Sequence, residues 1–132
     1  MAITLDHTIV PAKDHEASAR FFAELMGLRY EGPDRHFAPV RVNDTLTLDF
    51  CAAKDFRGHH LGFHVGEDDF DGILSRLKAM GVPYGNDPRD PANGKTDHLF
   101  GGRGLYFTDP NGHLFEVMTK VGPRAGTTRK AD

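Results

Sequence analysis

The chain has 132 residues with a formal net charge of −3, made up of 16 Lys and Arg against 19 Asp and Glu. This length predicts one domain, which can bury roughly two-thirds of the surface that its unfolded chain exposes. The absence of a basic excess argues against a nucleic-acid partner, and the single cysteine, Cys51, excludes an internal disulfide and a cysteine-rich zinc site.

The first predicted element is a strand over Ile3–Val10. Asp6 and His7 interrupt its apolar residues, so the segment is predicted to be neither a signal peptide nor a membrane span. The cytoplasm is therefore the expected compartment, with no membrane partner.

A helix and two strands are predicted next. Asp14 is a candidate N-cap for the helix, and Gly27 stands where a left-handed helix stop is expected. Strand-like runs over His36–Val42 and Thr45–Cys51 flank the turn signal Asn43-Asp44.

The second half repeats this order. A strand over His60–Val65 precedes a helix that Asp68 or Asp69 is predicted to cap and that Gly81 is predicted to end. The final strands are expected on either side of an Asp-Pro-Asn-Gly turn, over Gly104–Thr108 and His113–Thr119.

Matching motifs show that the two halves are repeats. Met26-Gly27-Leu28-Arg29-Tyr30 matches Met80-Gly81-Val82-Pro83-Tyr84 at an offset of 54, whereas the last strands match at an offset of 67. The difference of 13 residues places an insertion within the polar, Gly- and Pro-rich stretch 85–103, which predicts a long loop that is either a functional lid or a disordered segment. Each half is thus predicted as strand–helix–strand–strand–strand in a single domain over 1–120, with modules at about 1–53 and 58–120. The tail 121–132 is predicted to be flexible.

Strand alternation places chemically useful side chains at equivalent positions of the two repeats. His7 corresponds to His60, and Asp49 corresponds to Glu116. Carboxylates in otherwise apolar strands need a compensating partner, and imidazoles with carboxylates are a ligand set for a divalent transition metal. His60 shares its face of the strand with His64 across the small Gly62.

Each of these residues also has a simpler interpretation. His7 can be an ordinary surface residue, Asp49 an ion-pair partner of Arg41, and Tyr106 a core aromatic. His113, beside the last turn, is interpreted as stabilising that turn rather than as a metal ligand. The joint pattern of two histidines and two acids at matching repeat positions is what favours a metal site.

Three segments together resemble the vicinal oxygen chelate superfamily, which includes glyoxalase I, extradiol dioxygenases, fosfomycin-resistance thiol transferases and bleomycin-resistance proteins. They are the strand Leu5–Val10, the strand His60–Val65, and the motif from Gly104 through Asp109-Pro110-Asn111-Gly112 to Glu116. The resemblance covers roughly residues 3–119.

The resemblance implies an α+β fold of two βαβββ modules that form a cupped mixed sheet with the helices on its outer face. It implies a divalent metal (Fe, Mn, Ni, Co or Zn) held by His7, His60 and Glu116, with Asp49 at the position where glyoxalase I enzymes add an acid. It also implies a homodimer in which modules of two chains can complete each site.

The leading functional hypothesis is a metal-dependent isomerase or lyase whose small-molecule substrate chelates the metal through neighbouring oxygens. The alternatives are an Fe(II) extradiol-type dioxygenase and a non-catalytic binding protein of the resistance type. Beside Glu116, the acid–base candidates are His64 and Tyr106; the substrate-binding candidates are Arg103, His98 and again Tyr106.

Overall fold

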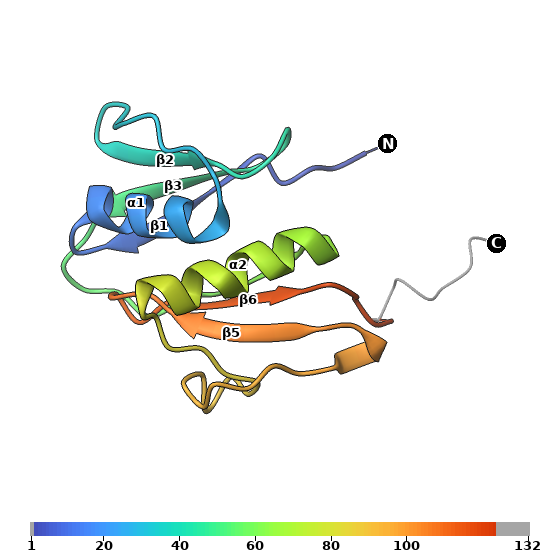
Figure 1. Cartoon of the computed structure of the whole chain (residues 1–132). Helices are drawn as coiled ribbons and strands as arrows, with labels where there is room; N and C mark the ends of the chain where they lie inside the picture. The colour runs from blue at the N-terminus through green and yellow to red at the C-terminus, as the bar shows by residue number, and fades with distance from the viewer. Residues whose placement is uncertain (1, 124–132) are drawn as a thin grey trace.

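Each half of the chain folds into a three-stranded sheet with one long helix in the computed structural model, which describes residues 2–123 (Figure 1). The first half contains β1 (His7–Ala12), α1 (His15–Met26), β2 (Phe37–Arg41) and β3 (Thr47–Ala52). The second half contains β4 (His60–His64), α2 (Glu67–Met80), the short 3-10 helix η1 (Leu99–Gly101), β5 (Gly104–Thr108) and β6 (Leu114–Met118).

The two sheets have the same topology. The last strand of each module lies in the centre, parallel to the first strand and antiparallel to the other, in the orders β1-β3-β2 and β4-β6-β5. This duplication confirms the predicted α+β fold of two related modules. The repeat predicts a fourth strand in each half. Among the described residues of the second half, this strand does not form a regular ladder. Gly85 makes an isolated bridge to Tyr106, because the Pro83-Tyr84-Gly85 sequence disfavours continuous pairing.

The glycines end both helices as predicted, whereas the N-cap of the second helix differs from the prediction. The Asp14 carboxylate accepts the Ala17 N–H at 3.1 Å, and Gly27 and Gly81 end the helices at φ 73° and 68°. The predicted Asp68 or Asp69 cap is wrong, because the N-cap of α2 is Gly66 without a side-chain bond. Both aspartates instead lie in the first turn, where their charge favours the helix N-terminus.

Contacts across the boundary join the two modules. The Phe22 ring of α1 lies 5.9 Å from Phe50 of its own module and 5.2 Å from Phe115 of the other, between ring centroids. Arg76 of α2 donates its Nε–H to the Leu25 carbonyl oxygen at 2.8 Å, at the end of α1. A shared core and a capped helix end therefore hold the modules in fixed positions.

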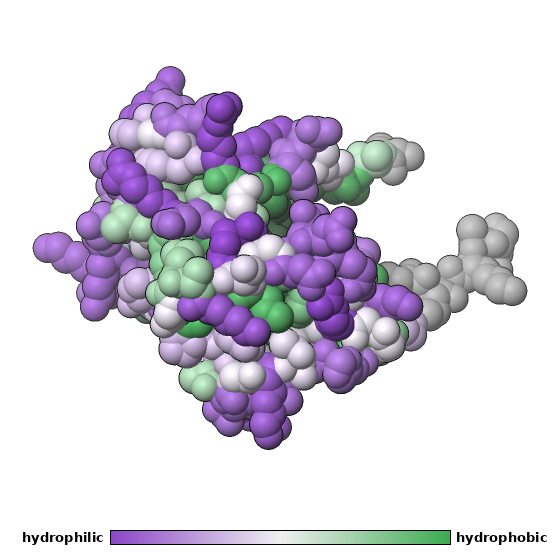
Figure 2. Space-filling model, in the orientation of Figure 1, coloured by the Kyte–Doolittle hydropathy of each residue, from purple (hydrophilic) through white to green (hydrophobic). Residues whose placement is uncertain are grey.

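The face of each sheet away from its helix remains open. Ile9 of β1 is 49% exposed, and Ile3 and Leu5, which precede β1 in the chain, are 93% and 65% exposed. Figure 2 shows a largely hydrophilic surface on the viewed side, with apolar residues exposed in the hollow between the two halves. Within residues 2–123, none of the helices has the length and apolar character needed to cross a bilayer.

Candidate metal centre

His60 and Glu116 lie side by side on the open face of the second sheet. The Nε2 atom of His60 is 3.1 Å from Oε1 of Glu116, although 56 residues separate them in the chain. The parallel register of β4 and β6 sets Gly62 directly opposite Glu116. A Cβ at Gly62 would lie 3.6 Å from Oε1 of Glu116, so the glycine leaves the carboxylate room over the strand.

The pair borders a shallow cavity of about 410 Å³. The His60 side chain is 52% exposed and the Glu116 side chain 19%, so both are accessible from this cavity. Its lining consists of His60, Gly62, His64, Glu116, Met118 and Val121. An imidazole nitrogen and a carboxylate oxygen at a solvent-accessible position fit a transition metal that keeps places for substrate.

Tyr106 supports Glu116 from the neighbouring strand. The two residues are opposite each other in the antiparallel register of β5 and β6, and the Tyr106 ring centroid is 6.1 Å from that of His60. Burial, and then the negative charge of Glu116, to which it is hydrogen-bonded, raise the pKa of Tyr106 to about 12. The phenol therefore keeps its proton at neutral pH and can donate it toward the Glu116 carboxylate.

His64 also lines the cavity, as the alternation on β4 predicts. Its Nε2 lies 3.0 Å from the carbonyl oxygen of Thr119, and a carbonyl can only accept, so Nε2 carries the hydrogen. In the neutral ring Nδ1 is then the nitrogen that can accept a proton. This arrangement suits His64 to the acid–base role predicted for it.

His7 and Asp49 belong to the other sheet. His7 is on β1, with its Nδ1 2.9 Å from Oδ2 of Asp6 and its side chain 60% exposed; Asp49 is on β3, in register with Ile9. Within residues 2–123 of one chain, no group of three or more His, Cys, Asp and Glu side chains is arranged to hold a metal ion. A single chain therefore supplies His60 and Glu116 together, without His7 or Asp49 beside them.

Arg103 is placed against α2 rather than in the cavity. Its guanidinium lies 2.9 Å from Glu67 and 2.7 Å from Asp71 and 4.5 Å from the centroid of the Phe70 ring. Hydrogen bonds to the two carboxylates raise the pKa of Arg103, with Asp71 contributing most. His98, the other substrate candidate of this loop, is exposed immediately before η1 and does not border the cavity.

Besides Gly62, two cavity residues, Met118 and Val121, have no counterpart among the predicted site residues. Met118 lies on the open face of β6 with Glu116, and strand alternation predicts that face. A methionine does not by itself indicate a functional site, so the residue type gave no signal. Val121 falls in the stretch that is predicted to be a flexible tail, yet it lines the cavity. The remainder of that stretch, 124–132, lies outside the described residues.

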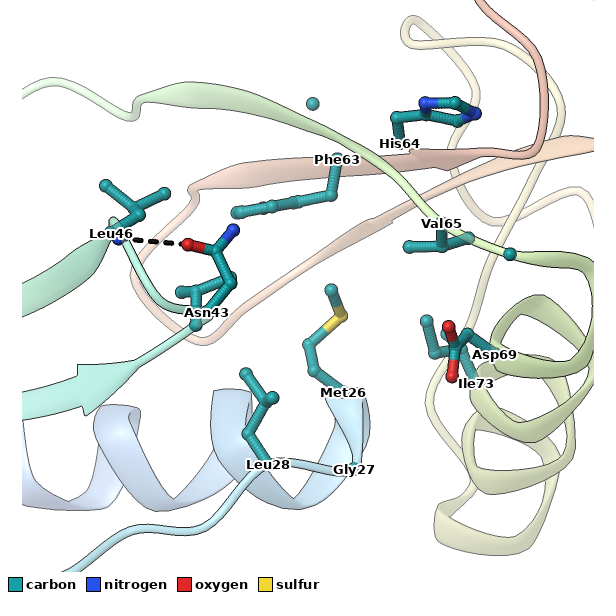
Figure 3. Close-up of a pocket in the computed structure, with 13 residues that line it drawn as sticks. Met26, Gly27, Leu28, Asn43, Leu46, Phe63, His64, Val65, Asp69 and Ile73 are labelled. Atoms are coloured by element: carbon teal, nitrogen blue, oxygen red, sulfur yellow. Dashed lines mark hydrogen bonds between the residues drawn. The ribbon is translucent and has the colours of Figure 1, made fainter. Parts of the chain in front are cut away.

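A second cavity of about 450 Å³ lies on the opposite side of β4 (Figure 3). Phe63 and Val65 point into it, toward Met26 at the end of α1, whereas His64 points away. The figure thus displays the alternation that separates the apolar side of β4 from the side that carries His60.

Comparison with known proteins gives the same assignment as the fold. The sequence model of the Glyoxalase/Bleomycin resistance protein/Dioxygenase superfamily matches residues 4–117. The chain belongs to this superfamily. Its members use divalent metals such as Mn, Fe, Zn and Ni, act on small molecules and are typically dimers.

Three proteins that are similar to the chain are an oxidase, a thiol transferase and a metapyrocatechase. The structure titled Oxidase ChaP-H2 is 40% identical, with a TM-score of 0.88 over 96% of this chain and 100% of that one. The Metallothiol transferase FosB of Lysinibacillus sphaericus is 27% identical over 88% of this chain and 82% of its own length. Metapyrocatechase 2 of Cupriavidus necator is 26% identical over 97% of this chain, which spans only 36% of that protein. These similarities support a metal-dependent enzyme of the superfamily.

Proposed function

We propose that the chain is a metal-dependent oxidase whose small-molecule substrate binds through two neighbouring oxygen atoms. The observation that carries the proposal is the similarity to two oxidases, ChaP-H2 and ChaP-H1, at 40% and 39% identity and TM-scores of 0.88 and 0.86. The His60–Glu116 pair supports it, because two histidines and one carboxylate are the ligand set of non-haem Fe(II) oxygenases.

This proposal reverses the order of the hypotheses drawn from the sequence. The isomerase or lyase hypothesis depended partly on Asp49 as an additional ligand, and in one chain Asp49 lies on the other sheet from Glu116. The similar Lactoylglutathione lyase structure from Agrobacterium tumefaciens is 18% identical, which supports the shared fold alone. The Fe(II) alternative therefore becomes the leading one.

The third ligand in this proposal is His7 of a second copy of the chain. His7 and His60 lie on β1 and β4, which are both edge strands of their sheets, and both side chains are more than half exposed. A two-fold dimer that sets β1 of each copy beside β4 of the other brings His7 to the His60–Glu116 pair twice. Within residues 2–123, the outer edges of β1 and β4 pair with no other strand, and this supports such an arrangement because open edges favour pairing with another chain.

The residues of the cavity have distinct roles in the proposed reaction. A divalent metal bound by His7, His60 and Glu116 would polarise the substrate oxygens and, as Fe(II), supply electrons for the reduction of dioxygen. In this proposal Tyr106 positions Glu116, and Nδ1 of His64 accepts a proton from a substrate hydroxyl; the bond of His64 Nε2 to the Thr119 carbonyl oxygen supports the second role because it leaves Nδ1 free of hydrogen in the neutral ring. Met118 and Val121 give the cavity an apolar side against which an apolar part of the substrate can pack.

The proposed function is tested by loading the purified protein separately with Fe(II), Mn(II), Ni(II) and Zn(II). We expect oxygen consumption with catechol-type probes, such as 2,3-dihydroxynaphthalene, in the Fe(II) form and none in the Zn(II) form, because Zn(II) has no redox chemistry. Conversion of a hemithioacetal by the Ni(II) or Zn(II) form, without oxygen uptake, would favour the isomerase. Tight probe binding with no metal bound would favour a binding protein.

A further inference from the structure

The cavity beside the His60–Glu116 pair has a polar floor and one apolar side. The floor consists of His60, His64 and Glu116, and the apolar side chains that line it are Met118 and Val121. Val121 is 54% exposed, so its apolar surface is accessible beside the His60–Glu116 pair.

The segment after β6 is covered by an aromatic ring from the long loop. A Cβ added at Gly122 would overlap Cε1 and Cζ of Phe100, so the ring lies directly against the Gly122 backbone. Phe100 has a φ of 56°, an uncommon backbone conformation for a bulky side chain. The absence of a side chain at residue 122 therefore permits the contact of Phe100 with the backbone of Gly122, the residue that follows Val121 in the chain.

Backbone contacts hold the loop and this segment together. The Arg103 N–H donates to Oγ1 of Thr119 at 2.8 Å, and an isolated antiparallel bridge joins Asp97 of the loop to Gly104, the first residue of β5. Leu99 and Phe100 are nevertheless 54% exposed, so the loop presents apolar surface outward rather than into the core.

We propose that Leu99, Phe100 and Val121 form an apolar wall at the rim of the cavity, and that Phe100 determines specificity for substrates with an aromatic ring system beyond their chelating oxygens. This inference rests on the proposed function. A substrate held by its oxygens near His60 and Glu116 extends its remaining atoms toward the rim, where contact with the wall removes apolar surface from water. A compact polar substrate gains nothing from this contact.

The test compares catechol with 2,3-dihydroxynaphthalene, which keeps the two hydroxyls and adds a second ring. Dissociation constants are measured by calorimetry on the Zn(II)-loaded wild type and on Phe100→Ala, in the absence of turnover. We expect the wild type to prefer the naphthalene, and Phe100→Ala to lose roughly fivefold to tenfold of this preference with unchanged catechol affinity. Phe100→Trp should retain the preference. Equal preference in the wild type and Phe100→Ala would overturn the inference.

Two further measurements separate the wall from the metal site and from other roles of the loop. In the metal-free protein, 2-naphthol should shift the Val121 methyl NMR signals in the wild type and not in Phe100→Ala. The absence of a shift in the wild type would contradict the proposed apolar wall. This measurement does not depend on metal binding. Phe21→Ala, which removes a partly buried ring on the helix side, is the matched control and should leave selectivity unchanged. If Phe100→Ala changes the dimer dissociation constant in sedimentation but not the selectivity, the ring is an interface residue and the inference is wrong.

Discussion

Replacing Glu116 with glutamine is expected to weaken divalent-metal binding by more than about 100-fold while leaving the fold intact. Loss of a residue that only supports a metal ligand already costs about 10- to 100-fold in affinity, so loss of the anionic ligand itself should cost more. Glutamine has nearly the same size and can still accept the hydrogen bond from Tyr106, so the effect isolates the charge. Affinity is measured by competition with a fluorescent Zn(II) indicator, and folding by the thermal midpoint.

His59→Ala is the matched control for this experiment. His59 is next to His60 in the chain, but its ring contacts His113, at 5.1 Å between centroids, and does not line the cavity. The control should bind metal with wild-type affinity, within about twofold, because no proposed ligand is touched. Equal losses in Glu116→Gln and His59→Ala would contradict the assignment of Glu116.

Replacing His113 with alanine is expected to lower the free energy of unfolding by about 2–4 kcal/mol. The ring is completely buried. Its Nδ1 accepts the backbone N–H of His59 at 2.8 Å, and its Nε2 donates to the Pro11 carbonyl oxygen at 2.6 Å. Alanine leaves both backbone groups without their partner and creates a cavity between the modules. Urea unfolding gives the free energy, and the thermal midpoint should fall by on the order of 10 °C.

His36→Ala provides the comparison for stability, because His36 is exposed ahead of β2. A change within about 0.5 kcal/mol is expected there. A similarly small effect of His113→Ala would show that the His113 contacts do not join the modules. The metal site should be weakened only indirectly, since His113 touches β1 and the residue before β4 rather than the cavity.

The sequence predicted the parts of the fold that depend on local signals. Gly27 and Gly81 adopt the left-handed conformation that their position after an amphipathic helix indicated. Alternation on β4 and β6 predicted that His60, His64 and Glu116 share a face, because parallel register and a period of two fix that relation once the strands are neighbours. The prediction of the α2 N-cap was wrong because three candidates for the cap position, Gly66 and two aspartates, lie within four residues of the chain.

Contacts between distant segments could not be predicted in the same way. Arg103 pairs with Glu67 and Asp71, which are 36 and 32 residues away in the chain. Local sequence patterns do not reveal such distant partners, so they were not considered when Arg103 was interpreted as a substrate ligand. His113 was expected to stabilise its own turn, and its N–H indeed bonds to Asp109 at 2.9 Å. The bond from its ring to Pro11 depends on how the two modules pack, which alternation within one sheet does not encode.

The placement of His7 is the central example of this limit. Strand alternation gives the face on which His7 lies, but the relation between the two sheets, and between two chains, is set by packing outside the strand itself. The proposed metal site therefore requires His7 of one copy to meet His60 and Glu116 of another.

Subunit mixing tests this claim most directly. His7→Ala and Glu116→Gln are each expected to bind no metal tightly, because each homodimer carries the same defect in both sites. After unfolding and joint refolding of equal amounts, half of the dimers are mixed; in each of these one site carries both substitutions and the other carries neither. Elemental analysis should then find about a quarter of the wild-type metal content. Recovery of no metal, with mixed dimers present, would contradict a site shared between chains.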